Sequence, residues 1–388
     1  MKRIKSHKIV LLDRIYDGYI YFEGGQIIEV SNNELEVSET YDYSHDFVLP
    51  GFIESHTHGA GGCGFLNSDV KDIVEACNTH LKHGTTAILP TITTASFGEM
   101  YNSIKNIKEA SNDNPDIIGV HLEGPYLSKK QCGAQNPDFI TKPIKDEYLK
   151  ILGDFPSFIK RWTYAPENDL DMEFTRALTN NNVIASIGHS DAKYSEVKKA
   201  VESGANLVTH LYSCTSTIVR ENGFRVLGVT ESAYAFDELS IELIADNRHL
   251  PKELLNLAIK IKGVDKVILT TDSLEIAGTD IKEGSMNAID FIVEDGVAKM
   301  TDRSAFVGSI ATSDILFRNV IDLGYSINEV SKMMSHNIAQ LLHVNKGDIK
   351  KGYDADFVIL NNNYQIKDVF TLGNKIKEKW VKWLKLES

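Results

Sequence analysis

The sequence predicts an α/β protein with a (β/α)8 TIM barrel at its centre and a small β-sandwich domain built from the N- and C-terminal segments. Eight short apolar, β-rich runs alternate with helical patterns through the middle of the 388-residue chain, as expected for parallel strands buried on both faces. The two ends are instead typical of short strands and turns. An open doubly wound sheet is the rival fold, but eight such units and the lack of G-x-G-x-x-G after the first strand disfavour it.

The small β domain is assigned to residues 1–47 and 345–388, and the barrel to residues 48–344. Near the amino terminus, two glycines separate the β-rich runs 19–22 and 26–30, a pattern that predicts a hairpin. Near the other end, residues 355–360 predict a strand of the same character. A single domain assembled from both ends is the most economical interpretation.

Each of the eight β-rich runs predicts one barrel strand. Most of them are continuously apolar, which favours burial on both faces over burial on one. They span residues 48–56, 85–91, 117–123, 160–164, 183–189, 207–210, 240–245 and 267–272.

Helices are predicted between the strands. The segment 68–84 begins with serine, continues with an apolar stripe at helical spacing and ends with glycine, which are start and stop signals for a helix. The segment 190–204 repeats this pattern, with Ser190 or Asp191 at its start. After the eighth strand, residues 294–296 predict a hairpin, and two helices follow at about 312–323 and 327–343.

The composition is that of a soluble globular protein, with 42% hydrophobic and 24% charged residues. The net charge of −13 argues against nucleic acid or an anionic membrane as the main partner. No apolar run is long enough for a signal peptide or a membrane span. Four cysteines without a C-x-x-C pair are expected to stay reduced: Cys63, Cys77, Cys132 and Cys214. A cytoplasmic location is therefore predicted.

Six polar residues lie at the carboxyl ends of predicted strands, the face on which barrel active sites assemble. The first two form an H-x-H pair, and residues two apart on an extended chain point to the same side. Four imidazoles and two carboxylates at such positions predict a site for one or two divalent transition-metal ions, of zinc or iron type. The six are His56, His58, Glu123, His189, His210 and Asp272.

Some alternatives within this set stay open. His121 lies two residues before Glu123, so it shares that face of the strand and is an alternative ligand. Cys63 and Cys214 lie close to ligands in the sequence, but small buried residues are the commoner role for such cysteines. The remaining histidines are expected on a helix (His80, His83) or at the surface (His7, His45, His343).

The order H-x-H, Glu, His, His, Asp around a barrel resembles the amidohydrolase superfamily. Several blocks between about residue 49 and about residue 360 more narrowly resemble the N-acetylglucosamine-6-phosphate deacetylase family. Glu123-Gly124-Pro125 is the most specific of them. The end of the fourth strand has no lysine of the kind that other amidohydrolases carbamylate, so Glu123 is expected to bridge instead. The blocks begin at Leu49, His121, Gly188, Thr209, Ile244, Thr271 and Lys350.

This resemblance implies a metal-dependent deacetylase that acts on an amino-sugar phosphate such as N-acetylglucosamine 6-phosphate and releases acetate. Glu123, His189 and His210 would hold the main metal, and His56 and His58 a second one. Asp272 would be a general base and then an acid, as well as a ligand. Family members are commonly dimers, which implies a homodimer. The products would be the amino-sugar phosphate and acetate.

Substrate contacts follow from the same resemblance. His249 matches a histidine that contacts the sugar, and Arg220 matches an arginine that binds the phosphate, a role that suits a guanidinium. Ser213-Cys214-Thr215 stands where the family usually has Asn-Ala-Met, which changes part of the phosphate cradle. Gln135 replaces a histidine that assists the carbonyl, and its amide is expected to donate one hydrogen bond to the developing oxyanion.

Two other functions are retained as alternatives. One is an amidohydrolase activity on a different acylated amine, such as N-acetylgalactosamine 6-phosphate or a dipeptide-like amide. The other is an inactive regulator that only binds a sugar phosphate. The presence of Asp272 with a full ligand set speaks against the regulator, because a binding module needs no general base.

Overall fold

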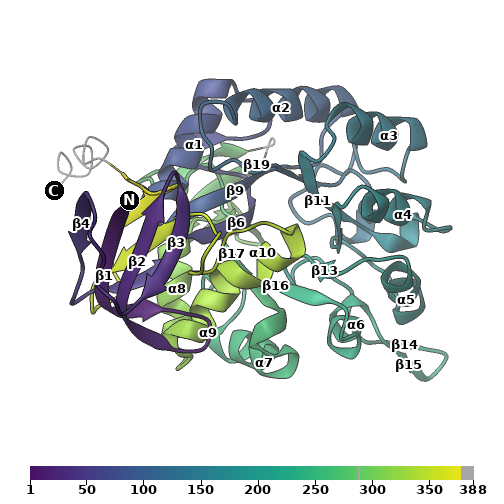
Figure 1. The fold of residues 1–388 in the computed structure, drawn as a ribbon. Coiled ribbons are helices and arrows are strands. Elements are labelled where there is room, and N and C mark those ends of the chain that lie inside the picture. Colours follow the sequence, from purple (N-terminus) through teal and green to yellow (C-terminus); the bar gives the residue numbers. More distant parts are fainter. Residues whose placement is uncertain (287–288, 377–388) are drawn as a thin grey trace.

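The computed structural model describes residues 1–286 and 289–376, whose strands form two eight-stranded sheets and three small ones (Figure 1). The helices α1 to α7 follow one another around the outside of the barrel sheet (Figure 1). The ten α-helices in this described part are α1 Val70–Lys82, α2 Phe97–Ala110, α3 Lys145–Asp154, α4 Glu173–Asn180, α5 Tyr194–Glu202, α6 Val229–Ala235, α7 Lys252–Lys262, α8 Ser313–Ile321, α9 Ile327–Ser331 and α10 Asn337–Leu342.

The barrel sheet has eight parallel strands, so each predicted barrel strand has its counterpart in the structure. The first and last strands meet through hydrogen bonds, since the Asp272 N–H donates to the His56 carbonyl at 3.0 Å. The strands are β6 Phe52–Thr57, β9 Thr85–Ile92, β10 Val120–Glu123, β11 Ile159–Tyr164, β12 Ile184–Ile187, β13 Leu207–Val208, β16 Ser240–Ile244 and β17 Val267–Thr270.

The prediction of one continuous strand over residues 48–56 is wrong. The chain forms β5 Phe47–Pro50 in the terminal sheet and then β6 in the barrel, with Gly51 between them. A Cβ atom on Gly51 would lie 1.9 Å from the Thr86 hydroxyl, so only glycine fits where the chain passes from one sheet to the other.

The terminal sheet combines strands from both ends of the chain, as predicted. The Phe22 ring on β2 packs against Phe357 and Phe370 at centroid distances of 5.7 and 6.4 Å, so strands that are not neighbours share one core. The division at residues 47 and 345 stays a proposal, and residues 377–388 lie outside the described residues. The strands are β1 Lys2–Val10, β2 Ile15–Glu23, β3 Gln26–Ser31, β4 Glu39–Asp42, β5, β22 Phe357–Leu360, β23 Ile366–Thr371 and β24 Asn374–Lys375.

The remaining strands form hairpins and a small four-stranded sheet. The hairpin predicted at residues 294–296 joins two strands of that small sheet. The strands are β7 Gly59–Ala60, β8 Cys63–Gly64, β14 Val219–Glu221, β15 Phe224–Val226, β18 Glu283–Met286, β19 Ile289–Glu294, β20 Val297–Met300 and β21 Phe306–Ser309.

The predicted helices exist, with shifted starts. α1 begins after Asp69, whose carboxylate accepts the Asp72 N–H at 2.9 Å. α5 begins later than predicted, because Ser190 and the Asp191 N–H bind the Glu167 carboxylate at 2.7 and 2.6 Å and keep this segment out of the helix. The helix expected at 327–343 consists of α9, a π-helical turn and α10. Among the described helices, none has both the length and the apolar character needed to cross a membrane.

Candidate metal centre and active site

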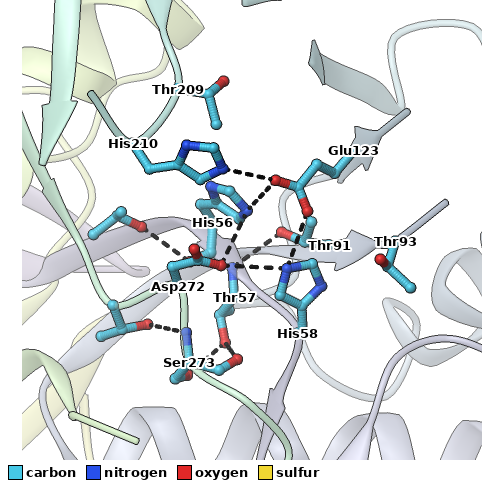
Figure 2. A network of polar contacts seen from close by, with 12 residues as sticks. His56, Thr57, His58, Thr91, Thr93, Glu123, Thr209, His210, Asp272 and Ser273 are labelled. Carbon is cyan, nitrogen blue, oxygen red and sulfur yellow. Dashed lines mark hydrogen bonds and ion pairs between the residues drawn. The ribbon is translucent and has the colours of Figure 1, made fainter. Parts of the chain in front are cut away.

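The six predicted ligands meet at the carboxyl end of the barrel. Figure 2 shows all of them except His189. They form two clusters, and within each cluster the ligand atoms lie within 4.8 Å of one another. Glu123 joins the clusters: its Oε1 lies 3.1 Å from Nε2 of both His189 and His210, and its Oε2 lies 3.2 Å from Nε2 of His58. The clusters are His56, His58 and Asp272, and Glu123, His189 and His210.

A local backbone turn aims three of these side chains. His189, His210 and Asp272 each lie two residues beyond the end of a barrel strand, and their φ angles are +47°, +27° and +45°. Positive φ is uncommon for residues other than glycine and costs free energy. Its recurrence at three equivalent strand ends indicates that the backbone bears this cost to bring the three side chains together.

The donors fit a divalent transition metal. Nε2 of His56 is buried without a hydrogen-bond partner, and it lies 3.3 Å from carboxylate oxygens of both Glu123 and Asp272. Imidazole nitrogens and carboxylate oxygens are the ligand types that zinc and iron accept. Two clusters that share one carboxylate therefore fit one or two ions.

The two carboxylates are ionised despite their burial. Burial opposes the charge of Glu123, but the His56, His189 and His210 imidazoles outweigh it and hold the pKa of this carboxyl well below its ordinary value. Burial likewise opposes the charge of Asp272, and His56 and His58 bring its pKa down in the same way. Both groups are thus available as ligands or proton acceptors at neutral pH.

His121 is not in either cluster. Its ring nitrogens lie 3.1 Å from the Thr91 hydroxyl and 2.8 Å from the Thr163 hydroxyl, so neither nitrogen is free to take the place of Glu123. Burial, with Arg161 nearby, holds its pKa well below the ordinary value. The clusters of described residues contain neither Cys63 nor Cys214.

A cavity of about 440 Å³ opens over the clusters. It is lined by several predicted substrate contacts, namely Gln135, Ser213, Cys214 and His249, and by Phe306 of the small sheet. The predicted phosphate contact Arg220 is not in its wall, because this residue lies exposed on the β14–β15 hairpin.

The orientation of the Gln135 amide is fixed by its neighbours. Its Oε1 accepts hydrogen bonds from the Thr94 N–H at 2.9 Å and from the Thr93 hydroxyl at 2.6 Å. Because a backbone N–H only donates, Nε2 is the end that faces Glu123, at 2.6 Å from Oε2. The amide group has two N–H donors, and Glu123 takes one of them.

His249 is held at the other side of the cavity. Its Nδ1 lies 2.7 Å from the Asp246 carboxylate, and its ring contacts Phe306 with a centroid distance of 5.3 Å. Burial opposes protonation of this imidazole, but Asp246 outweighs it and raises its pKa. Asp246 and Phe306 therefore fix the orientation of the His249 ring at the cavity wall.

Several supporting residues were not predicted. Glu242 and Arg161 form a buried ion pair beneath His56, and the Glu54 carboxylate accepts the backbone N–H groups of His56 and Thr271. Their sequence signal is a charged residue inside a β-rich run rather than at its carboxyl end. His80 on α1 is fully buried and bonds Thr57 at 3.0 Å.

Comparison with known proteins agrees with this geometry. Residues 47–378 match the model of the amidohydrolase family. The chain is 31% identical to an N-acetylglucosamine-6-phosphate deacetylase of Lysinibacillus sphaericus over 91% of this chain and 92% of that protein. It is 28% identical to an N-acetylgalactosamine-6-phosphate deacetylase of a Shewanella species, over 86% of this chain and 84% of that protein.

A solved structure extends the likeness to the fold. The crystal structure of an N-acetylglucosamine-6-phosphate deacetylase from Thermotoga maritima superposes with a TM-score of 0.85 at 28% identity. The match covers 96% of this chain and 99% of that one. Both the barrel and the terminal sheet are therefore shared with this relative.

Proposed function

The chain belongs to the amidohydrolase family and is an amide hydrolase, and within this family we propose that it removes acetate from an N-acetylated amino-sugar phosphate such as N-acetylglucosamine 6-phosphate. The observation that carries the proposal is the convergence of four imidazoles, Glu123 and Asp272 on one cavity. The names of the relatives support the acetylated amino-sugar phosphate as substrate.

The proposal includes one or two divalent transition-metal ions, of zinc or iron type. Glu123, His189 and His210 would hold the main ion, and His56 and His58, with Glu123 shared, would hold the second. When bound, such an ion lowers the pKa of water toward 7 and polarises the amide carbonyl.

The side chains of the cavity supply the remaining chemistry. Asp272 accepts a proton from the attacking water and delivers it to the departing amine, so that the C–N bond breaks and acetate and the free amine leave. Gln135 donates an N–H to the carbonyl oxygen as negative charge develops on it. His249 contacts the sugar from the cavity wall, and Ser213 and Cys214, on the same wall, form part of the phosphate cradle.

N-acetylgalactosamine 6-phosphate is the second candidate substrate, because one relative carries that name. We further propose that the protein works in the cytoplasm as a homodimer. Its partner is a small molecule rather than nucleic acid or membrane, in keeping with its net charge of −13.

The proposal is tested by acetate release from a panel of substrates, together with metal analysis of the purified protein. We expect acetate from N-acetylglucosamine 6-phosphate in the metal-loaded protein, and its loss after chelation with recovery on adding metal back. The panel includes the galacto epimer, both unphosphorylated sugars and an aspartyl dipeptide. Metal-loaded protein that releases acetate from no N-acetyl sugar contradicts the proposal.

We keep Arg220 as the proposed phosphate contact although it lies outside the cavity wall. Arg220→Ala is then expected to raise KM for the phosphorylated sugar and to leave KM for the unphosphorylated sugar almost unchanged, because a guanidinium binds phosphate through paired hydrogen bonds. Steady-state kinetics on both sugars measure this. Arg225, which pairs with Arg220 on the same exposed hairpin, gives the matched control Arg225→Ala. Equal losses on both sugars would remove phosphate recognition from Arg220.

A further inference from the structure

A buried ion pair lies directly behind the metal centre, on the side away from the cavity. Glu242 of β16 and Arg161 of β11 are both fully buried, and Arg161 Nη1 donates to Glu242 Oε2. Nδ1 of His56 lies 2.9 Å from Glu242 Oε1. The carboxylate of Glu242 therefore connects a fixed guanidinium to the ring of a predicted metal ligand.

The surroundings hold this carboxylate in one place. Glu242 Oε1 also accepts the His210 N–H at 3.1 Å. Arg161 is itself anchored, since Nη2 donates to the Thr209 hydroxyl at 2.9 Å and Nη1 to the Ser55 carbonyl at 3.4 Å. A buried charge pair with this many partners has little freedom to move.

The contact sets which nitrogen of His56 faces the site. An ionised carboxylate only accepts hydrogen bonds, so Nδ1 of His56 must be the donor. In the neutral ring the lone pair is then on Nε2, the atom that lies 3.3 Å from Glu123 and Asp272. A metal-ligating histidine is commonly held in this way, by a carboxylate on its other nitrogen.

We propose that Glu242, held by Arg161, is a positioning residue that orients His56 and strengthens metal binding in the His56–His58–Asp272 cluster. The inference rests on the metal centre of the proposed function. It predicts that the ion pair supports metal binding by this cluster more than by the Glu123–His189–His210 cluster.

The other cluster lacks this support. Nδ1 of His189 lies 2.8 Å from the neutral carbonyl oxygen of Gln131, and Nδ1 of His210 is buried without a partner. A neutral carbonyl raises the basicity of an imidazole less than a carboxylate does. Replacing Glu242 should therefore weaken the binding of the ion held by His56 and leave the binding of the other ion unchanged.

The test is a titration of metal-free protein with zinc, in which a chelator of known affinity reports each dissociation constant. Wild type should bind two ions. In Glu242→Gln we expect the weaker of the two sites to lose about 10- to 100-fold in affinity, the usual effect of removing such a partner. The tighter site should be unchanged. His56→Ala identifies the site concerned, because it should abolish the same binding step.

The matched control is Asp169→Asn. Asp169 is also a buried carboxylate, but it binds Thr175 and the Phe174 N–H and contacts no predicted ligand. The Asp169→Asn variant should keep the wild-type zinc dissociation constants at both sites. If Glu242→Gln does not fold, Glu242→Asp keeps the charge beside Arg161 and withdraws the oxygen from His56, and it should weaken the same site.

The outcomes separate the two proposals. Unchanged zinc affinities in the Glu242 variants overturn the inference. Equal weakening of both sites also overturns it, because that result means that Glu242 acts as general support through the His210 N–H. Wild type with a single ion overturns the inference and leaves a one-metal deacetylase, whereas wild type with no ion overturns the proposed function.

Discussion

Asp272→Asn is expected to lower kcat for acetate release by about 10² to 10⁴, the usual contribution of general acid–base catalysis. Asparagine keeps the shape of the side chain and removes the group that accepts the proton. Asp272 lines the cavity, and its Oδ1 lies 3.3 Å from Nε2 of both His56 and His58. The carboxylate thus lies at the cavity, beside two predicted metal ligands, where the proposed proton transfer would take place. Steady-state kinetics with saturating metal measure the effect.

Metal analysis of the same variant separates the two roles of Asp272. The asparagine carbonyl oxygen remains a ligand, so we expect the metal content to fall little while kcat falls greatly. Glu275→Gln, which neutralises another carboxylate of the cavity wall, is the control and should change kcat far less. Near-normal kcat in Asp272→Asn would exclude the proton transfer, and parallel loss of metal and kcat would make Asp272 a ligand alone.

The barrel and the cluster of imidazoles and carboxylates at its carboxyl end could be predicted because each depends on a local pattern. Continuously apolar runs mark strands that are buried on both faces. The carboxyl ends of parallel strands meet on one face of a barrel, so residues such as Glu123 and His210 were expected together although 87 positions separate them. The strand predicted over residues 48–56 shows where local patterns fail. The break at Gly51 depends on a contact with Thr86 on another strand, which no local pattern reveals.

The features that were missed depend on contacts between distant segments. Glu242 and Arg161 are 81 positions apart, and nothing in the spacing of either residue indicates that they pair inside the barrel. A charged residue within an apolar strand suggests that this part of the strand is exposed to solvent. In this barrel, however, Arg161 and Glu242 are buried and neutralise each other. Likewise, the late start of α5 depends on Glu167, which lies outside the helix and its neighbouring strand.

Gln135 stands where the family it resembles has a histidine, and removing its amide is expected to lower kcat strongly. Gln135→Ala should lower kcat about 10²- to 10³-fold, the usual loss for a single oxyanion donor. The amide is rigidly presented, because Thr93 and the Thr94 N–H hold its oxygen and its nitrogen faces Glu123 at the cavity. One N–H remains for the carbonyl oxygen of the substrate.

The hydrogen bond between Gln135 and Glu123 offers a second explanation for a fall in kcat. Without Gln135, Glu123 would move away from its place as a proposed metal ligand. Metal content measured together with kcat distinguishes the two explanations. Loss of an oxyanion donor lowers kcat with metal retained, whereas loss of a residue that only positions Glu123 lowers both metal content and kcat. Gln135→His restores a donor of the family type and should recover part of the activity lost in Gln135→Ala. If Gln135→Ala keeps wild-type kcat, stabilisation of the oxyanion comes from other groups, and the amide serves only to hold the loop against Thr94.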